Sequence, residues 1–70
     1  MIKCHLSRLM GERKLKVSDL ARDLAINRGT ITRLYMETAE RVDIEVIDKL
    51  CDYFNCQVED IFEYIPPHTK

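Results

Sequence analysis

Seventy residues are enough for one small domain spanning residues 1–70, and a chain of this length buries only about 60% of the surface that its unfolded form exposes. Hydrophobic residues make up 46% of the chain and charged residues 33%, the composition of an ordinary globular protein. No apolar run is long enough to cross a bilayer or to act as a secretory signal, so we expect a cytoplasmic protein without a membrane partner.

The chain begins with a predicted helix over about residues 4–14. One face of this helix carries residues at helical spacing: Leu6, Leu9, Met10 and Arg13. Basic Arg13 and Lys14 suit the negative end of the helix dipole. Gly11 weakens the helix by about 1 kcal/mol relative to alanine.

Residues 17–24 are predicted to form the second helix. Its apolar face consists of Leu20, Ala21 and Leu24, and the small Ala21 would let another helix cross it closely. Ala25 and Ile26 interrupt the pattern and end the helix.

The third predicted helix spans residues 28–35 and begins at Asn27, whose side-chain oxygen can accept from the free amides of the first turn. Ile31 and Leu34 lie three residues apart and face inward. The polar side chains are left to face outward: Arg28, Thr30, Thr32 and Arg33. Residues 17–35 are thus predicted to form two short helices joined by a tight turn, with polar groups presented by the second helix. This is the arrangement of a helix-turn-helix.

Residues 36–42 show no clean apolar period and are predicted to form a loop. Asp43 would cap a fourth helix over residues 44–54. The inward positions of that helix are Val46 or Ile47, Leu50, Cys51 and Phe54. Asn55 suits the left-handed conformation that often ends a helix. A short fifth helix over residues 58–62 follows, and the proline-containing tail, residues 66–70, is expected to be flexible.

The joint spacing of these residues resembles that of the phage-repressor-like helix-turn-helix regulators, also called Cro/repressor-type or xenobiotic-response-element-type regulators. The pattern comprises Leu20-Ala21, Leu24, Ile26, Asn27, Thr30-Ile31, Arg33-Leu34, Asp48-Lys49-Leu50-Cys51 and Val58-Glu59-Asp60-Ile61-Phe62. The resemblance covers roughly residues 4–64 and implies an all-α fold, a compact bundle of five short helices. In some members the termini also pair as a small β-ribbon, here residues 2–4 with residues 63–65.

Two positions depart from the family pattern. Ala25 stands in the turn where the family often has glycine. Lys16 and Val17 stand where the family often has serine or threonine followed by glutamine, which removes one familiar phosphate contact.

A recognition helix over residues 28–35 would enter the major groove of double-stranded DNA and read base edges. Arg28 can bond guanine bidentately, Arg33 can reach a base or a phosphate, and by resemblance the following loop runs along the phosphate backbone. The expected DNA-binding residues are Asn27, Arg28, Gly29, Thr30, Thr32, Arg33, Thr38 and Arg41. The alternative for the two helix arginines is a pair of solvated surface charges.

The net charge of −1 hides an uneven distribution. Residues 1–42 carry nine Lys and Arg against five Asp and Glu, a net charge of +4, whereas residues 43–70 carry two against seven, a net charge of −5. A basic face around the helix-turn-helix and an acidic back would suit a DNA-binding protein, although ordinary solvated charge is the alternative.

Three cysteines without a secretory signal indicate free thiols. Cys4, Cys51 and Cys56 with His5 or His68 lack the C-x-x-C or H-x-x-x-H spacing of a zinc site, and Cys51 is expected to be a small buried hydrophobic residue. There is no recognisable nucleophile setting and no glycine-rich phosphate loop. We therefore expect no enzyme, no metal and no cofactor.

The sequence thus predicts a small transcriptional regulator, by resemblance a repressor, that binds a near-palindromic operator. Large apolar residues gather near the end of the chain: Tyr53, Phe54, Phe62, Tyr64 and Ile65. Any that stay exposed would suit a homodimer through the fourth and fifth helices and the C-terminal segment. The alternative is an antitoxin-like protein that binds a toxin and autoregulates. Such antitoxins often carry an extra flexible segment that this chain almost lacks, which favours the regulator.

Overall fold

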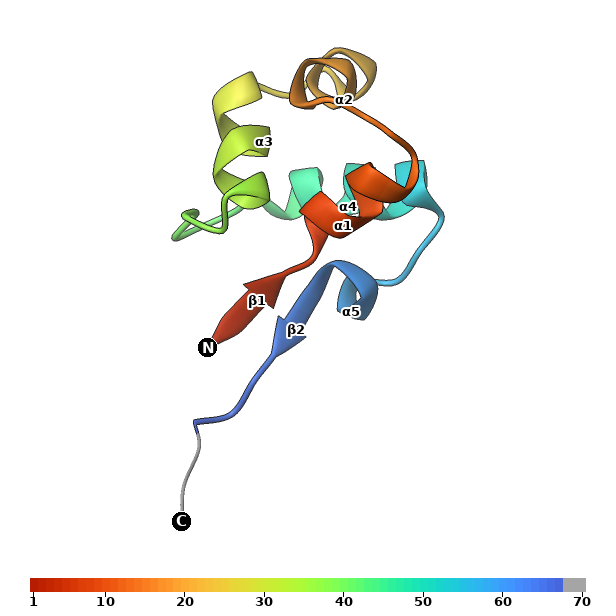
Figure 1. Ribbon diagram of the computed structural model, residues 1–70. Helices are drawn as coiled ribbons and strands as arrows, with labels where there is room; N and C mark the ends of the chain where they lie inside the picture. The colour runs from red at the N-terminus through yellow and green to blue at the C-terminus, as the bar shows by residue number, and fades with distance from the viewer. Residues whose placement is uncertain (68–70) are drawn as a thin grey trace.

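The computed structural model describes residues 1–67, and these form five helices and two short strands (Figure 1). In chain order the elements are β1 (Ile2–Cys4), α1 (Leu6–Glu12), α2 (Val17–Leu24), α3 (Arg28–Tyr35), α4 (Ile44–Phe54), α5 (Val58–Ile61) and β2 (Phe62–Tyr64). This mostly helical fold with one small sheet confirms the predicted fold class. Residues 68–70, which belong to the predicted flexible tail, lie outside the described residues.

Helices α2, α3 and α4 have the predicted bounds, whereas α1 and α5 are shorter than predicted. Helix α1 does not include Cys4, because Cys4 pairs with Phe62 in the sheet. It also ends before Lys14, whose φ of 56° is incompatible with a continuing helix. Helix α5 ends at Ile61 because Phe62 already has extended backbone and belongs to β2.

The two strands join the ends of the chain in an antiparallel ribbon that lies below α1 to α4 and beside α5 in Figure 1. Ile2 lies opposite Tyr64. The predicted pairing of the two ends of the chain is therefore confirmed, but the second strand covers residues 62–64 and not the expected residues 63–65. Met1 and Ile65 extend the pairing, since the Ile65 amide donates to the Met1 carbonyl at 2.8 Å and the Met1 ammonium donates to the Ile65 carbonyl at 2.7 Å.

The core lies between the helices and the inner side of the ribbon. Its buried hydrophobic residues are Cys4, Leu6, Met10, Leu20, Ala21, Ile31, Leu34, Val46, Leu50, Phe54 and Ile61. Of the two alternatives on α4, Val46 is buried and Ile47 is half-buried. The expectation that Cys51 is buried is wrong, because its side chain lies half-exposed at the edge of a groove between α4 and α5.

Helices α1 to α4 share one kind of ending. Each is followed by a non-glycine residue of positive φ: Lys14 (56°), Ala25 (55°), Glu37 (61°) and Asn55 (53°). After each of them, an amide donates to the carbonyl five residues back: Leu15 to Met10 (2.9 Å), Ile26 to Ala21 (3.0 Å), Thr38 to Arg33 (2.9 Å) and Cys56 to Cys51 (3.0 Å). These bonds define Schellman motifs, which turn the chain sharply and satisfy the last carbonyls of the helix. The left-handed ending predicted at Asn55 is confirmed.

Candidate nucleic-acid interface

The buried face of α3 fixes which of its side chains reach solvent. Ile31 and Leu34 are buried in the core, as their spacing predicts. Arg28, Thr32 and Arg33 are exposed on the opposite side. The fourth polar residue that was predicted to face outward, Thr30, is only half-buried and lies at the edge of the outer face. The helix therefore presents two arginines and hydroxyl groups away from the core.

The first turn of α3 is organised by Asn27, whose Oδ1 accepts from the Gly29 amide at 2.7 Å and caps the helix as predicted. A β-carbon at Gly29 would lie 2.9 Å from that oxygen and 3.2 Å from Nη1 of Arg33. The Arg33 guanidinium thus folds back toward the start of the helix and occupies space that a larger residue than glycine would take. The charge of Arg33 lies near the N-terminal turn, where the free amides also favour an anion.

A groove of about 400 Å³ separates α3 from the loop that follows it. It gathers four of the predicted DNA-binding residues: Thr30, Arg33, Thr38 and Arg41. The other four lie outside it, at the N-cap or on the helix: Asn27, Arg28, Gly29 and Thr32. Glu40 and Asp43 also line the groove, so its polar groups are mixed in charge. Asp43 stands at the N-cap position of α4 and borders this groove, but within residues 1–67 its side chain does not make the predicted capping hydrogen bond.

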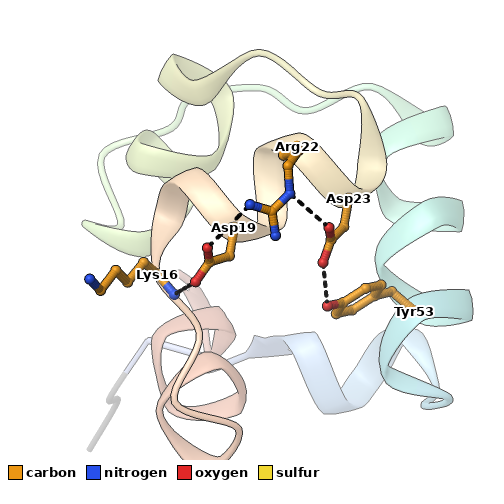
Figure 2. A network of polar contacts seen from close by, with 5 residues as sticks. All are labelled: Lys16, Asp19, Arg22, Asp23 and Tyr53. Carbon is orange, nitrogen blue, oxygen red and sulfur yellow. Dashed lines mark hydrogen bonds and ion pairs between the residues drawn. The ribbon is translucent and has the colours of Figure 1, made fainter.

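The arginines differ in whether they are already neutralised by neighbouring carboxylates. On α2, Arg22 lies 3.7 Å from Asp19 and 3.2 Å from Asp23, as Figure 2 shows. Within the described residues, no ion pair involves the arginines of α3 and its loop: Arg28, Arg33 and Arg41. These three arginines therefore make no ion pair of their own, although Glu40 and Asp43 line the same groove, and they can bind an anionic partner.

Comparison with protein families matches residues 5–67 to the Cro/C1-type HTH DNA-binding domain. The chain belongs to this family. The match confirms the predicted resemblance and places residues 5–67 in a DNA-binding domain of the helix-turn-helix type, in a family of regulators and not of enzymes. No curated protein matches the chain. Of the helices in residues 1–67, none has both the length and the apolar character needed to cross a bilayer.

In this Cro/C1-type domain the loop after α3 is tied to the β-ribbon by Glu37. The Glu37 carboxylate accepts from the Cys4 amide at 3.3 Å and lies 3.8 Å from Nζ of Lys3. Glu37 is also the left-handed residue that ends α3. It thus holds the loop that carries Thr38 and Arg41. Sequence analysis missed this role, because the contact joins residues 33 positions apart and nothing in the local pattern signals it.

Helix α4 holds α2 in place through polar side chains. Nζ of Lys49 donates to the Leu24 carbonyl at 3.2 Å, at the C-terminal end of α2. The Tyr53 hydroxyl donates to the Asp23 carboxylate at 2.9 Å, as seen in Figure 2, and this hydrogen bond raises the pKa of Tyr53. Since α2 packs against α3, these bonds also fix the position of α3.

Arg13 was expected to lie within the first helix, on the same face as Leu6, Leu9 and Met10, but it lies exposed just after α1. Its guanidinium donates to the carbonyls of Tyr53 at 3.3 Å and Phe54 at 3.2 Å, and its central carbon lies 5.0 Å from the centre of the Phe54 ring. A cation at the C-terminal end of α4 is favourable for the helix dipole. Arg13 therefore stabilises the C-terminal end of α4.

The start of α2 compensates for the departure at Lys16. Because a lysine ammonium has no acceptor atom, its side chain cannot cap the helix. Asp19 supplies half of a capping arrangement instead, since its carboxylate accepts from the Lys16 amide at 3.1 Å (Figure 2). The helix therefore begins at Val17 without the serine or threonine that the family often has there.

Proposed function

We propose that this Cro/C1-type domain binds a specific near-palindromic operator in double-stranded DNA and represses transcription as a cytoplasmic homodimer. The observation that carries the proposal is the set of three arginines around α3 that make no ion pair with a carboxylate within residues 1–67: Arg28, Arg33 and Arg41. Arg22, in the same half of the chain, has two such partners. Arg28 and Arg33 on α3 and Arg41 in the following loop thus keep their positive charge available for an anionic partner.

The outer residues of α3 would take different roles on the duplex. Arg28 in the first turn would bond the O6 and N7 of a guanine, and Thr32 would contact an adjacent base edge. Arg33, folded back over Gly29, would reach a base or phosphate at the same end of the helix. On the other side of the groove, Thr38 and Arg41 would contact phosphates, which fix the register of the protein on DNA.

Support for a homodimer comes from exposed apolar residues on α4, α5 and the ribbon. Ile44 is 78% exposed and Tyr64 is 64% exposed, and Ile2 and Val58 are also exposed. Two grooves of about 370 and 310 Å³ border this side, and Ile47 and Val58 line both, so the apolar surface is continuous. Such a patch is typical of a surface that binds another protein.

The composition of this surface differs from the sequence expectation. Of the large apolar residues expected to contribute, Phe54 is buried, while Tyr53, Phe62 and Ile65 are half-buried, so only Tyr64 remains exposed. The other exposed groups are aliphatic side chains from α4, α5 and β1. A dimer would place two recognition helices about 34 Å apart, one turn of DNA, and would double the number of base pairs read.

The test begins with selection of binding sites from random duplex DNA. We expect an inverted repeat, and Arg28→Ala and Arg33→Ala should each lower affinity for the selected site about 5- to 150-fold, the loss of one good base contact. Arg8→Ala is the matched control, because Arg8 is an exposed arginine on α1 outside the groove. Parental affinity for both α3 variants would overturn the assignment of α3 as the recognition helix.

Two further measurements test the dimer and the direction of regulation. Light scattering of the protein with the selected duplex should give two chains per duplex, and one chain on a non-repeated sequence would contradict the dimer. A reporter promoter that contains the selected site should lose output when the protein is expressed. A gain in output would show an activator.

A further inference from the structure

Two of the three free thiols lie together at the C-terminal end of α4. Cys51 is in the last turns of the helix, Cys56 is the second residue after it, and both are half-buried. The third thiol, Cys4, is buried in β1 and lines a different groove. None of these cysteines takes part in the proposed DNA interface, so their arrangement needs a separate explanation.

The Schellman motif at the end of α4 determines how close the pair is. Asn55 has φ 53° and its amide donates to the Asp52 carbonyl at 3.3 Å, while the Cys56 amide donates to the Cys51 carbonyl at 3.0 Å. In this motif the side chains of the first and last of the six residues commonly touch. Cys51 and Cys56 occupy these two positions.

The equivalent positions of the other Schellman motifs in this chain carry different chemistry. The motifs that end α1 and α2 pair apolar residues, Met10 with Leu15 and Ala21 with Ile26. The motif that ends α3 pairs two polar residues, Arg33 and Thr38. Only the motif that ends α4 brings two thiols together among these four. Both thiols border the groove of about 310 Å³ between α4 and α5, which gives a small reagent access.

The pKa of Cys56 also indicates that the Cys51 thiol is close to it. Burial is the largest cause that raises this pKa, and the neighbouring Cys51 thiol and Asp60 raise it further. A thiol with a raised pKa is mostly protonated at neutral pH and reacts slowly. Cys56 is therefore expected to stay reduced until a disulfide oxidant is supplied.

We propose that Cys51 and Cys56 form a reversible intramolecular disulfide and thus a redox-modifiable site at the end of α4. The oxidant is a small disulfide of the glutathione class. One cysteine thiolate attacks a sulfur of the oxidant, forms a mixed disulfide and releases one small thiol. The second cysteine thiolate then attacks the protein sulfur of that mixed disulfide and releases the other small thiol. The oxidant gains two electrons, and the two protons lost by the cysteines end on the two released thiols.

Ring closure should be favoured over other pairings because the folded chain already holds the two cysteines on one turn. A disulfide requires α-carbons within about 4.4–6.8 Å and β-carbons that do not point apart, and the two end positions of a Schellman motif are brought together by its turn. The new bond would enclose only residues 52–55 and would fasten the left-handed turn at Asn55. Cys4 cannot compete in the folded state, since it is buried and borders another groove.

The test uses the full chain in oxidised glutathione, followed by acid quenching, alkylation in denaturant and mass spectrometry. We expect a monomer that has lost two hydrogen atoms, with one alkylated cysteine, Cys4. Proteolysis before Asp52 cuts the chain between the paired cysteines, so the two fragments should stay joined until a reductant is added. Reduced glutathione in excess should restore all three free thiols.

Three variants act as controls, and circular dichroism checks that each one is folded. Cys4→Ser should form the bridge to the same extent as the parent, whereas Cys51→Ser and Cys56→Ser should form no internal bridge. A bridge that includes Cys4, a bridge between two chains, or glutathione adducts that never close would each overturn the proposal. If a variant does not fold, the fragment map of the parent decides the question alone. The experiment contains no DNA, so its outcome is independent of the proposed operator binding.

Discussion

The turn between α2 and α3 offers the sharpest test of how this fold is stabilised. Ala25 has φ 55° and ψ 44°, the left-handed conformation in which a β-carbon approaches the following carbonyl. That conformation costs an L-residue about 1–2 kcal/mol, and glycine does not pay it. The side chain of Ala25 is exposed, so removal of its methyl group loses little packing.

We expect Ala25→Gly to stabilise the protein by about 1 kcal/mol. The gain from relieved strain is partly offset, because glycine gives the unfolded chain more freedom, which costs about 0.4–1 kcal/mol. For a domain of this size the net change corresponds to a rise of about 4–8 °C in melting temperature. Urea unfolding and thermal unfolding, both followed by circular dichroism, measure it.

Ala21→Gly is the matched control, since it makes the same chemical change four residues earlier in α2. Ala21 is helical and only 5% exposed. Its replacement should destabilise the protein by about 2 kcal/mol, from lost helix propensity and one lost buried methyl group. The two substitutions should therefore shift the unfolding midpoint in opposite directions. If Ala25→Gly lowered stability as Ala21→Gly does, the argument from backbone strain would be refuted.

Three further results are expected. Ile31→Ala should cost about 2–5 kcal/mol and unfold much of the population at 37 °C, whereas Met36→Ala, at a residue 62% exposed and outside the proposed dimer surface, should leave the melting curve nearly unchanged; equal effects would mean that the apolar face of α3 was misassigned. The logarithm of operator affinity should fall linearly with the logarithm of salt, by about 0.9 per phosphate contacted, and Arg41→Ala should make the slope shallower by about 1; an unchanged slope would exclude a phosphate contact there. Tyr53→Phe should lower stability at pH 7, while Tyr35→Phe should not. Because the folded-state pKa of Tyr53 is raised above its usual 10.0, the parent should lose stability as pH rises through that pKa, and the Phe variant should lack this loss; parallel pH profiles would contradict the bond to α2.

The amino-acid sequence alone determined the elements whose ends and faces are set by neighbouring residues. The apolar period gave α2, α3 and α4 their bounds, and it placed Ile31 and Leu34 inward. Asn27 and Asn55 marked a helix start and a helix end, because each acts through its own backbone or the next turn. The joint spacing of such residues was also enough to indicate the family that the chain belongs to.

Only the tertiary structure decided which distant segments meet. Cys4 belongs to a strand and not to the predicted first helix, because β2, more than fifty residues later in the chain, pairs with it. Glu37 holds the loop after α3 through an amide in β1, and a Schellman motif formed at Ala25 without a glycine. The exposed apolar surface likewise contains Ile44, which no end-of-chain pattern indicated. Periodicity reports the backbone and the buried face of one element at a time, whereas these features depend on contacts between elements far apart in the chain.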